Sequence, residues 1–499
     1  MITKTLRRQV SPRKSQLLLS VLVTALLAGC ANWEGLSPQG KVLDANTLGA
    51  SKSLSGARVD ASVWPQQNWW TALGDAQLSS LIDEALKNNP TLEVADARTR
   101  VALAQAGQAD AARMPRVDAA AAYSGIRIPG TVLPAPFGDG YAALKMVSLK
   151  FSYDFDLWGG QRAAWEAAVG QSRATEIDGQ QARITLSGNL ARTYAQLGYA
   201  WQLQDIAKAD LQRAQDQLKL VQQRVDAGID SQVQLKQAQS ALPAARQQLE
   251  STQQQIDDSQ LALAALLGAG PDRGQQLARP QVLQPSALAL PSVLPAELVG
   301  RRADIVAAKW RVESASKEIK TAQTKFYPDF NLTAAIGLAS LGLGNLAEWD
   351  SRYGQLGPAL TLPIFDGGRL RANLSAKDAQ YDLAVAQYNQ SLVNAMHEVA
   401  AQISALRSLA RQVTQQKEAI QTAQQAYELS MQRYHGGLGN YLDVLSIQQQ
   451  LLNAQMRLAG LNAQQLDASV LLVQALGGGY RPADDTPTLA TASAPAQAQ

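Results

Sequence analysis

Few residue patterns in this chain could carry out chemistry by themselves. His397-Glu398 begins like the helical motif of zinc proteases, but Ala401 stands four positions after the histidine, where the motif needs a second histidine. Gly40-Lys41 is followed by Val42, so no phosphate-binding loop is expected there. Two histidines in 499 residues allow neither a three-histidine zinc site nor a convincing Ser/His/Asp triad. The sequence therefore predicts a protein that is not an enzyme and has no cofactor and no metal.

The single cysteine is the one side chain whose position indicates a covalent modification. Residues 1–29 hold basic side chains, no acid and the apolar run from Leu17 to Ala28, which together predict a secretory signal peptide. The string Leu27-Ala28-Gly29-Cys30 resembles a bacterial lipobox, which implies that Cys30 becomes the lipid-bearing first residue. By the same resemblance, Ala31 favours export to the outer membrane. The alternative is a plain signal peptide with an incidental cysteine.

Composition and charge exclude several classes of protein. One cysteine excludes a disulfide framework. The formal net charge is +3, but five cations lie within residues 1–29, so the remainder carries −2 and gives no reason to expect nucleic acid as a partner. After the signal region no run of 18 apolar residues occurs, so any membrane-spanning part would have to consist of β-strands.

The body of the chain repeats itself at a spacing near 209 residues, with Arg224 corresponding to Arg433 and Gly228 to Gly437. Each half reads as a helix, two alternating stretches, a very long helix, a turn and a second long helix. We therefore expect a signal peptide over 1–29, a lipidated N-terminal arm over 30–70, a first repeat over 71–272, a proline-rich connector over 273–295, a second repeat over 296–480 and a disordered tail over 481–499.

The long helical stretches have the periodicity of coiled coils. Ala207, Leu211, Ala214 and Leu218 follow one another in steps of four and three, and similar series occur in the other long stretches. A repeat of 3.5 residues is typical of helices wound around neighbouring helices. No proline occurs from position 160 to position 225, so this helix could extend over roughly 100 Å. Pro243 is expected to kink the helix that returns.

Four stretches alternate between apolar and polar residues with a period of two. One is centred near Val117, one covers 147–155, one covers 330–338 and one runs from Leu356 to Ile364. Each is about 9–11 residues long, the length of a tilted transmembrane β-strand. In the second stretch the residues predicted to face lipid are Val147, Leu149, Phe151, Tyr153 and Phe155.

Four strands are too few to close a barrel, because about eight are needed to enclose even a core of side chains. An open sheet in lipid would leave two edges with unpaired backbone groups, each costing several kcal/mol. Either the chain therefore oligomerises, or these strands do not lie in a membrane. Three copies would supply twelve strands around a water-filled bore, and twelve long helices around the same axis.

Several short strings, in order and across both halves, resemble the TolC-like outer-membrane factors of the lipid-anchored, NodT-type branch. They are Asn88-Asn89-Pro90, Arg301 to Ile305, Phe326 to Asp329, Leu362 to Gly368 and Ala475 to Tyr480. The resemblance covers about residues 65–480. It implies an α+β membrane protein in which four transmembrane strands per chain complete a trimeric β-barrel, continued by a long coiled-coil α-barrel in the periplasm.

The same resemblance implies a function and partners. The chain would be the outer-membrane exit duct of a tripartite efflux system, a homotrimer anchored in outer-membrane lipid. It would passively conduct small molecules such as drugs and aromatic compounds, delivered by an inner-membrane pump and a periplasmic adaptor. The alternative is a periplasmic scaffold or adaptor lipoprotein without a pore. An adaptor should have a single hairpin flanked by compact β-modules, and the duplicated halves favour the duct.

The turns between the long helices, Val225–Ser231 and Tyr434–Asp443, are expected to form the periplasmic tip. Gly228 and Gly437 allow the chain to reverse tightly. The resemblance places the gate of the duct at this end.

Four residues of the tip are candidates for the gate. Tyr434 and Asp443 stand where the resemblance places gating residues, and Asp226 and Asp230 are further acids of the tip. Repeated by three copies, an inward-facing aspartate would form a ring of negative charge that favours cations. For Asp226 and Asp230 the alternative is a solvated turn whose acids face outward.

Overall fold

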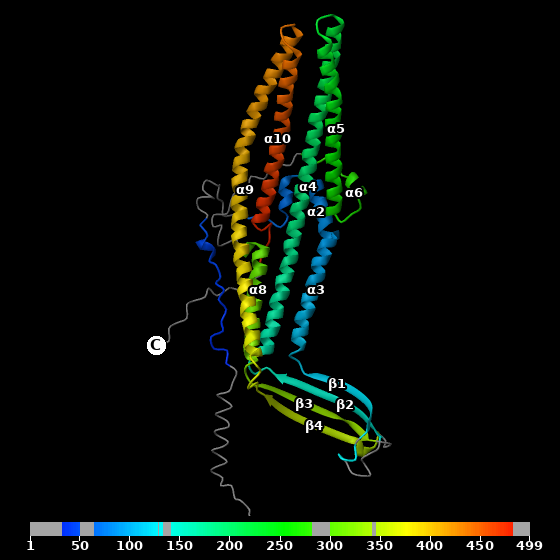
Figure 1. Ribbon diagram of the computed structural model, residues 1–499, viewed down its shortest axis with the longest axis vertical. Helices are drawn as coiled ribbons and strands as arrows, with labels where there is room; N and C mark the ends of the chain where they lie inside the picture. Colours follow the sequence, from blue (N-terminus) through cyan, green and yellow to red (C-terminus); the bar gives the residue numbers. More distant parts are fainter. Residues whose placement is uncertain are drawn as a thin grey trace, which may run out of the picture.

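The computed structural model describes residues 32–49, 64–127, 129–132, 141–281, 300–341 and 346–482. The predicted signal peptide, the predicted lipidation residue Cys30, most of the connector (282–295) and residues 483–499 of the tail lie outside the described residues. The described chain is elongated, with two long helical hairpins at one end and a four-stranded sheet at the other (Figure 1).

Apart from one additional helix at the start of the first half, the described parts of the two halves contain the same elements in the same order. The first half comprises α2 (Ala76–Asn88), α3 (Pro90–Ala111), β1 (Arg116–Arg127), β2 (Tyr141–Phe155), α4 (Gly160–Asp226) and α5 (Gln232–Leu266). The second comprises α8 (Ala303–Thr324), β3 (Asp329–Leu341), β4 (Arg352–Thr361), α9 (Arg369–His435) and α10 (Tyr441–Ala475). Helices α4 and α9 both have 67 residues, α5 and α10 both 35, and α3 and α8 both 22. Short helices η1 (Ala45–Thr47), η2 (Trp69–Leu73), α6 (Asp272–Gln275) and η3 (Trp349–Ser351) complete the described elements.

Helices α5 and α10 begin at N-cap residues whose side chains bond to the first turn, and the long helices pack along the predicted seams. Ser231 caps α5 in a capping box with Gln234, and the Asn440 side chain accepts a hydrogen bond from the second residue of α10. The seam residues Ala207 and Ala214 of α4 are buried, as the coiled-coil pattern predicts. Helix α5 continues through Pro243. Among the described helices, none is both long enough and apolar enough to cross a membrane.

Helix α4 lies at the centre of the helical part. It contacts α3 and α8 in the half near the sheet, and α5 and α10 in the half near the tips, while α9 contacts α8 and α10 (Figure 1). One edge of this layer is therefore formed by α3 and α5, and the other by α9. The sheet matches this order, because β1 follows α3 and β4 precedes α9.

The sheet has the antiparallel order β1-β2-β3-β4, and its register brings the four alternating patterns together. Val117 lies opposite Phe151, Phe151 opposite Ala334, and Ala334 opposite Leu356. Directly opposed residues share a face. One face, here called the apolar face, thus carries Val117, Ala119, Ala121, Val147, Leu149, Phe151, Tyr153, Phe155, Phe330, Leu332, Ala334, Ile336, Leu338, Leu356, Pro358 and Leu360. The opposite face, the polar face, carries Asp118, Lys150, Asp154 and Asn331 among others.

The strands differ from the predicted ones in length and position. β2 has 15 residues and β3 has 13, which is longer than expected. β4 runs from Arg352 to Thr361 and not from Leu356 to Ile364. Arg352 and Gly354 lie at apolar-face positions, but neither has a large apolar side chain. The alternating pattern therefore did not predict the first residues of β4. The strand ends before Pro363, which has no N–H for a sheet hydrogen bond.

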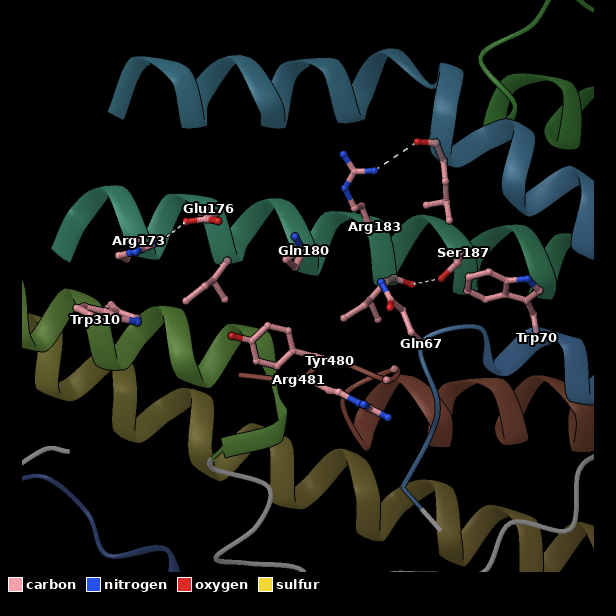
Figure 2. A pocket seen from close by; sticks show the side chains of 15 residues that line it. Gln67, Trp70, Arg173, Glu176, Gln180, Arg183, Ser187, Trp310, Tyr480 and Arg481 are labelled. Carbon is pink, nitrogen blue, oxygen red and sulfur yellow. Dashed lines mark hydrogen bonds and ion pairs between the residues drawn. The ribbon is translucent and has the colours of Figure 1, made fainter. Parts of the chain in front are cut away.

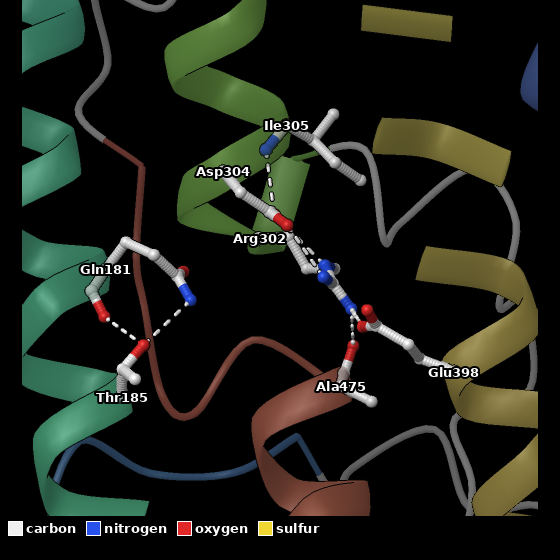
Figure 3. Close-up of polar contacts among 7 residues, drawn as sticks. All are labelled: Gln181, Thr185, Arg302, Asp304, Ile305, Glu398 and Ala475. Carbon is white, nitrogen blue, oxygen red and sulfur yellow. Dashed lines mark hydrogen bonds and ion pairs between the residues drawn. The ribbon is translucent and has the colours of Figure 1, made fainter. Parts of the chain in front are cut away.

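Arg302 joins the start of α8 to α9 and to the C-terminal end of α10 (Figure 3). Its guanidinium donates hydrogen bonds to Asp304 at 2.7 and 3.0 Å, to the Glu398 carboxylate at 2.7 Å and to the backbone carbonyl of Ala475 at 3.0 Å. The side chain is buried, and these contacts satisfy it at the meeting point of α8, α9 and α10. Burial lowers the pKa of this guanidinium, but its carboxylate partners outweigh the effect and the pKa is raised, so the charge is permanent.

We expect Arg302→Ala to destabilise the fold strongly, because it removes the donor to the Ala475 carbonyl and to the Glu398 carboxylate and leaves Asp304 with only the Ile305 N–H. Removing one partner of a buried ion pair costs about 3–5 kcal/mol. The matched control is Arg192→Ala, because the Arg192–Asp467 pair is partly exposed and such pairs contribute about 1 kcal/mol or less. Thermal unfolding followed by circular dichroism in detergent compares the two, and equal losses would show that Arg302 is not a special anchor.

Candidate functional site

Both turns between the long helices lie at the end of the molecule farthest from the sheet (Figure 1). Gly228 and Gly437 have φ values of 73° and 74°, a conformation that favours glycine and lets α4 and α9 reverse into α5 and α10. The structure places all four predicted tip residues at these turns. Asp230 lies inside the first turn, Asp226 ends α4, Tyr434 is in the last turn of α9 and Asp443 is in the first turn of α10.

Tyr434 connects the two hairpins. It is 1% exposed and packs with Val221 of α4 and with Tyr441 of α10. Its hydroxyl donates a hydrogen bond to the Asp230 carboxylate of the other hairpin. Arg224 donates to the same carboxylate at 2.9 Å and lies 4.4 Å above the Tyr434 ring. We call Arg224, Asp230 and Tyr434 the tip clasp.

The electrostatics of the tip clasp favour its bonded form. Burial raises the pKa of Asp230, but hydrogen bonds from Arg224 and Tyr434 outweigh it and hold the pKa below its usual value. Burial, together with the Asp230 carboxylate, raises the pKa of Tyr434, so its hydroxyl remains a donor at neutral pH. The pKa of Arg224 is raised by its hydrogen bond to Asp230. The three groups therefore keep these protonation states across the physiological range.

A second polar layer joins the hairpins behind the tip clasp. The amide of Gln217 donates to Gln448 at 2.7 Å, and the amide of Gln448 donates to Asp210 at 2.9 Å. Gln217 also donates to the Tyr427 hydroxyl at 3.2 Å. Gln217 and Gln448 are buried. Water can replace such hydrogen bonds when a contact opens, so each contributes only about 0.5–1.5 kcal/mol net.

The structure brings only part of the predicted set together. Tyr434 and Asp230 are bonded, and Arg224 neutralises Asp230, so Asp230 is not a free anion of the tip. Asp226 is exposed and accepts a hydrogen bond from Gln222 at 3.0 Å. Asp443 is also exposed and lines a hollow of about 420 Å³ on the second hairpin, together with Arg433.

A second hollow, of about 440 Å³, lies between α4, α8 and the segment that follows α10 (Figure 2). Three charged side chains that line it are paired. Arg173 pairs with Glu176 at 3.1 Å, and Arg183 pairs with Asp96, outside the lining, at 3.3 Å. The Ser187 hydroxyl donates to a backbone carbonyl at 3.0 Å and not to a base. In the part of the chain that the structure describes, no cluster of three or more His, Cys, Asp or Glu side chains could hold a metal ion.

The apolar face of the sheet is uncovered in the single chain. Ile336 is 63% exposed, Leu356 72% and Leu360 68%. The five predicted lipid-facing residues of β2 all lie on this face. On the polar face, Ser148 is 2% exposed and the Tyr353 ring lies against Gly337, whereas the charged side chains of Asp118 and Lys150 are exposed. Large apolar side chains at this density need an apolar environment or a partner.

Aromatic side chains gather where the sheet meets the helices. On the apolar face, the Phe155 ring lies 4.8 Å from that of Tyr153 and 5.1 Å from that of Phe330. Close by, Trp158 stacks on Tyr327 at 4.6 Å. Aromatic girdles of this kind mark the boundary of the apolar band in transmembrane β-proteins. We call these five residues the inner aromatic cluster.

A family model described as "Outer membrane efflux protein" matches residues 81–269 and 294–478, one segment in each half. The chain belongs to the outer membrane efflux protein family. It is 35% identical over 375 residues to the fusaric acid resistance protein FusA of Burkholderia cepacia, covering 73% of this chain and 70% of FusA. It is 30% identical over 483 residues to the multidrug resistance outer membrane protein MdtP of Escherichia coli, covering 95% of this chain and 98% of MdtP.

Among solved structures, the fold resembles that of the outer membrane protein VceC of Vibrio cholerae, with a TM-score of 0.77 and 38% identity. The similarity covers 83% of this chain and all of VceC. The efflux protein described here is thus an outer-membrane efflux duct, located in the outer membrane and extending into the periplasm. The alternative of a scaffold without a pore is not supported.

Proposed function

We propose that three copies of this efflux protein close into one duct, with a β-barrel across the outer membrane and an α-barrel in the periplasm. The observation that carries this proposal is the register, which gives one chain a sheet with an apolar face and two open edges, β1 and β4. Such edges are not tolerated in lipid, so each must pair with another copy.

The order of elements indicates how the copies would meet. The edge formed by β1, α3 and α5 of one copy would face the edge formed by β4 and α9 of the next. This contact joins different surfaces of the two copies and closes into a ring. Both edges present apolar side chains for it, since Val94 and Val101 of α3 and Leu383 and Leu429 of α9 are exposed. The polar face of the sheet would line the bore.

The test is the oligomeric state of the purified protein in detergent. We expect the mass of three 53.4-kDa chains, before removal of a signal peptide, by light scattering corrected for detergent. Cysteine pairs placed on β1 and β4 in the Cys30→Ser background should cross-link between chains. A compact monomer without such cross-links would contradict the proposal.

We also propose that Cys30 carries a lipid at the level of the inner aromatic cluster. Asn32 follows two residues later, and its backbone carbonyl accepts a hydrogen bond from Arg371 at the start of α9. Trp33 contacts Tyr327 of the cluster, with a distance of 5.3 Å between ring centroids. Two residues of chain span at most about 7 Å, so acyl chains on Cys30 would begin close to this boundary. Residues beyond Trp33 then run along α9, where Gly40 donates to Asp382 at 2.6 Å.

Replacing Cys30 by serine is expected to remove the lipid and leave the fold intact, because the described N-terminal segment holds to α9 through its own contacts. Metabolic labelling with palmitate should fall to background, while thermal stability and conductance in planar bilayers stay unchanged. The control is wild-type protein labelled in parallel. Loss of the oligomer in Cys30→Ser would show that the anchor has a larger role.

The duct would act passively, in series with a periplasmic adaptor and an inner-membrane pump, and the pump would choose the cargo. The names of relatives refer to fusaric acid resistance, multidrug resistance and pyoverdine export, which supports small molecules such as drugs and aromatic compounds as cargo. The tip clasp would hold the periplasmic end closed until these partners engage. Deleting the gene should raise sensitivity to the cargo, and the tip variants described in the Discussion test the gate.

A further inference from the structure

The apolar face does not stay apolar to its far end. From the row that pairs Val147 with Leu338 outward, the same register places three basic residues on this face. Arg352 lies opposite Leu338, Lys145 opposite Tyr123 and Ser340, and Arg127 opposite Tyr141. We call Arg127, Lys145 and Arg352 the basic rim. On the four strands, this face carries no acid to balance the rim.

The basic rim lies at the sheet end away from the helices, at a distance that matches the apolar layer of a membrane. Phe155, in the inner aromatic cluster, and Lys145 are ten residues apart on β2. Ten residues of strand extend about 33 Å. For a strand tilted by about 40°, this corresponds to about 25 Å along the membrane normal, the height of the apolar band of outer-membrane barrels.

The surroundings of the basic rim are suited to a membrane boundary. Tyr123 is 75% exposed and Tyr141 83%, and both lie beside the rim on the same face. The Arg352 guanidinium lies over the ring of Trp349, 2.9 Å from its centroid. Glu348 and Asp350 flank Trp349 in the adjoining segment, so three cations stand against two acids. Among the described residues, none of the three cations forms an ion pair with a carboxylate.

The two ends of the apolar face therefore differ in charge. The inner aromatic cluster contributes aromatic rings and no charge, whereas the basic rim combines aromatic rings with cations. A surface with acyl-chain contacts below and cations above is complementary to a lipid with a negatively charged headgroup. Arginine in particular matches the geometry of phosphate oxygens.

We propose that the basic rim binds the phosphate groups of lipid A, the phosphorylated glucosamine disaccharide of the outer leaflet. This inference rests on the proposed function, which places the apolar face in the membrane with the helices in the periplasm. The rim then lies in the outer leaflet, within reach of the lipid A phosphates, while the apolar rows contact the acyl chains. Three copies would bind a ring of such lipids around the duct.

The test compares two variants that lose the same number of cations from opposite faces of the sheet. Lys145→Gln with Arg352→Gln removes two cations of the basic rim. Arg116→Gln with Lys150→Gln removes two from the polar face, where Arg116 belongs to an exposed ion pair that adds little stability. Purified trimers in detergent are titrated with lipid A, and bound lipid is counted by native mass spectrometry. Phosphatidylglycerol serves as a second anionic probe, and conductance in planar bilayers verifies that each variant inserts.

A cation near an anionic lipid surface contributes about fivefold in affinity. We expect the rim variant to bind lipid A on the order of 25-fold more weakly, with the polar-face variant unchanged and both conducting. Equal lipid A binding by all three proteins, with conductance intact, would overturn the rim proposal and leave the duct standing. If the protein bound phosphatidylglycerol as tightly as lipid A, the proposal that the basic rim is a site for lipid A would be wrong. Absence of conductance and of oligomer in the wild-type protein would instead overturn the proposed function, and the rim proposal with it.

Discussion

Tyr434→Phe is expected to open the periplasmic end of the duct. The substitution removes the hydroxyl that donates to Asp230 and keeps the buried ring, so packing with Tyr441 is retained. A hydrogen bond to a charged group contributes about 1.5–3 kcal/mol. Losing this hydrogen bond in each copy would lower the ratio of closed to open tips by tenfold or more. Single-channel conductance in planar bilayers should rise several-fold.

Asp230→Asn should have a larger effect, because it also leaves Arg224 buried without its counter-charge. Breaking such a pair costs about 3–5 kcal/mol. The matched control is Asp226→Asn. This substitution removes an equal charge four residues before Asp230, from an exposed side chain that accepts a hydrogen bond from Gln222. The gate assignment is wrong if conductance is the same in wild type, Tyr434→Phe and Asp230→Asn, or if Asp226→Asn opens the tip equally.

The same clasp predicts a pH dependence. The pKa of Asp230 is lower in the folded tip than in a free aspartate, whose pKa is near 4. The tip clasp therefore stabilises the closed tip fully when the pH is above the free-aspartate pKa. Stabilisation is lost as the pH falls through the lowered pKa and Asp230 becomes protonated. Conductance of the wild type should therefore be constant around neutral pH and rise only in strongly acidic solution, whereas Asp230→Asn should lack this acid response.

The elements of the fold were predictable because their patterns are local. Alternation at 147–155 identified β2, and the 3.5-residue repeat identified the helices of both hairpins. Position 352 shows where this reasoning failed, since Arg352 belongs to the apolar face by register and not by its own hydropathy. The basic rim was missed for the same reason, because a strand end at a membrane boundary no longer follows the alternation.

The site was predictable only in part. The resemblance pointed to Tyr434 and Asp443, and Asp226 and Asp230 could be named only as further acids of the tip. Tyr434 and Asp230 are 204 residues apart in the chain. Which acid Tyr434 contacts depends on how the two hairpins pack, and no periodicity encodes that. Gln217 and Gln448 were missed because glutamine in a coiled-coil sequence usually indicates a solvated face. Here the Gln217 amide donates to Gln448 inside the interface, and the Gln448 amide donates to Asp210.

Leu149→Arg with Phe151→Arg is expected to abolish assembly in the membrane. Both residues lie on the apolar face, in its middle rows, where a cation costs about 2–4 kcal/mol per side chain in a transmembrane barrel. With two changes in each of three copies, the total cost is about 12–24 kcal/mol, which is comparable to or larger than the stability of an ordinary folded domain, about 5–15 kcal/mol. The variant should be made in the Cys30→Ser background, because a lipid anchor would keep unassembled chains on the membrane and mask the defect.

The matched control places the same number of cations on the other face of the sheet, as Ser152→Arg on β2 with Ala335→Arg on β3. Their direct partners in the register are Thr333 for Ser152 and Lys150 for Ala335, both on the polar face. If that face lines a water-filled bore, the control variant should form trimers, resist extraction by alkaline carbonate and conduct ions with altered selectivity. The apolar-face variant should wash off and give no conductance. A sheet that does not lie in the membrane would make the two variants behave alike, because both faces would then be in contact with water.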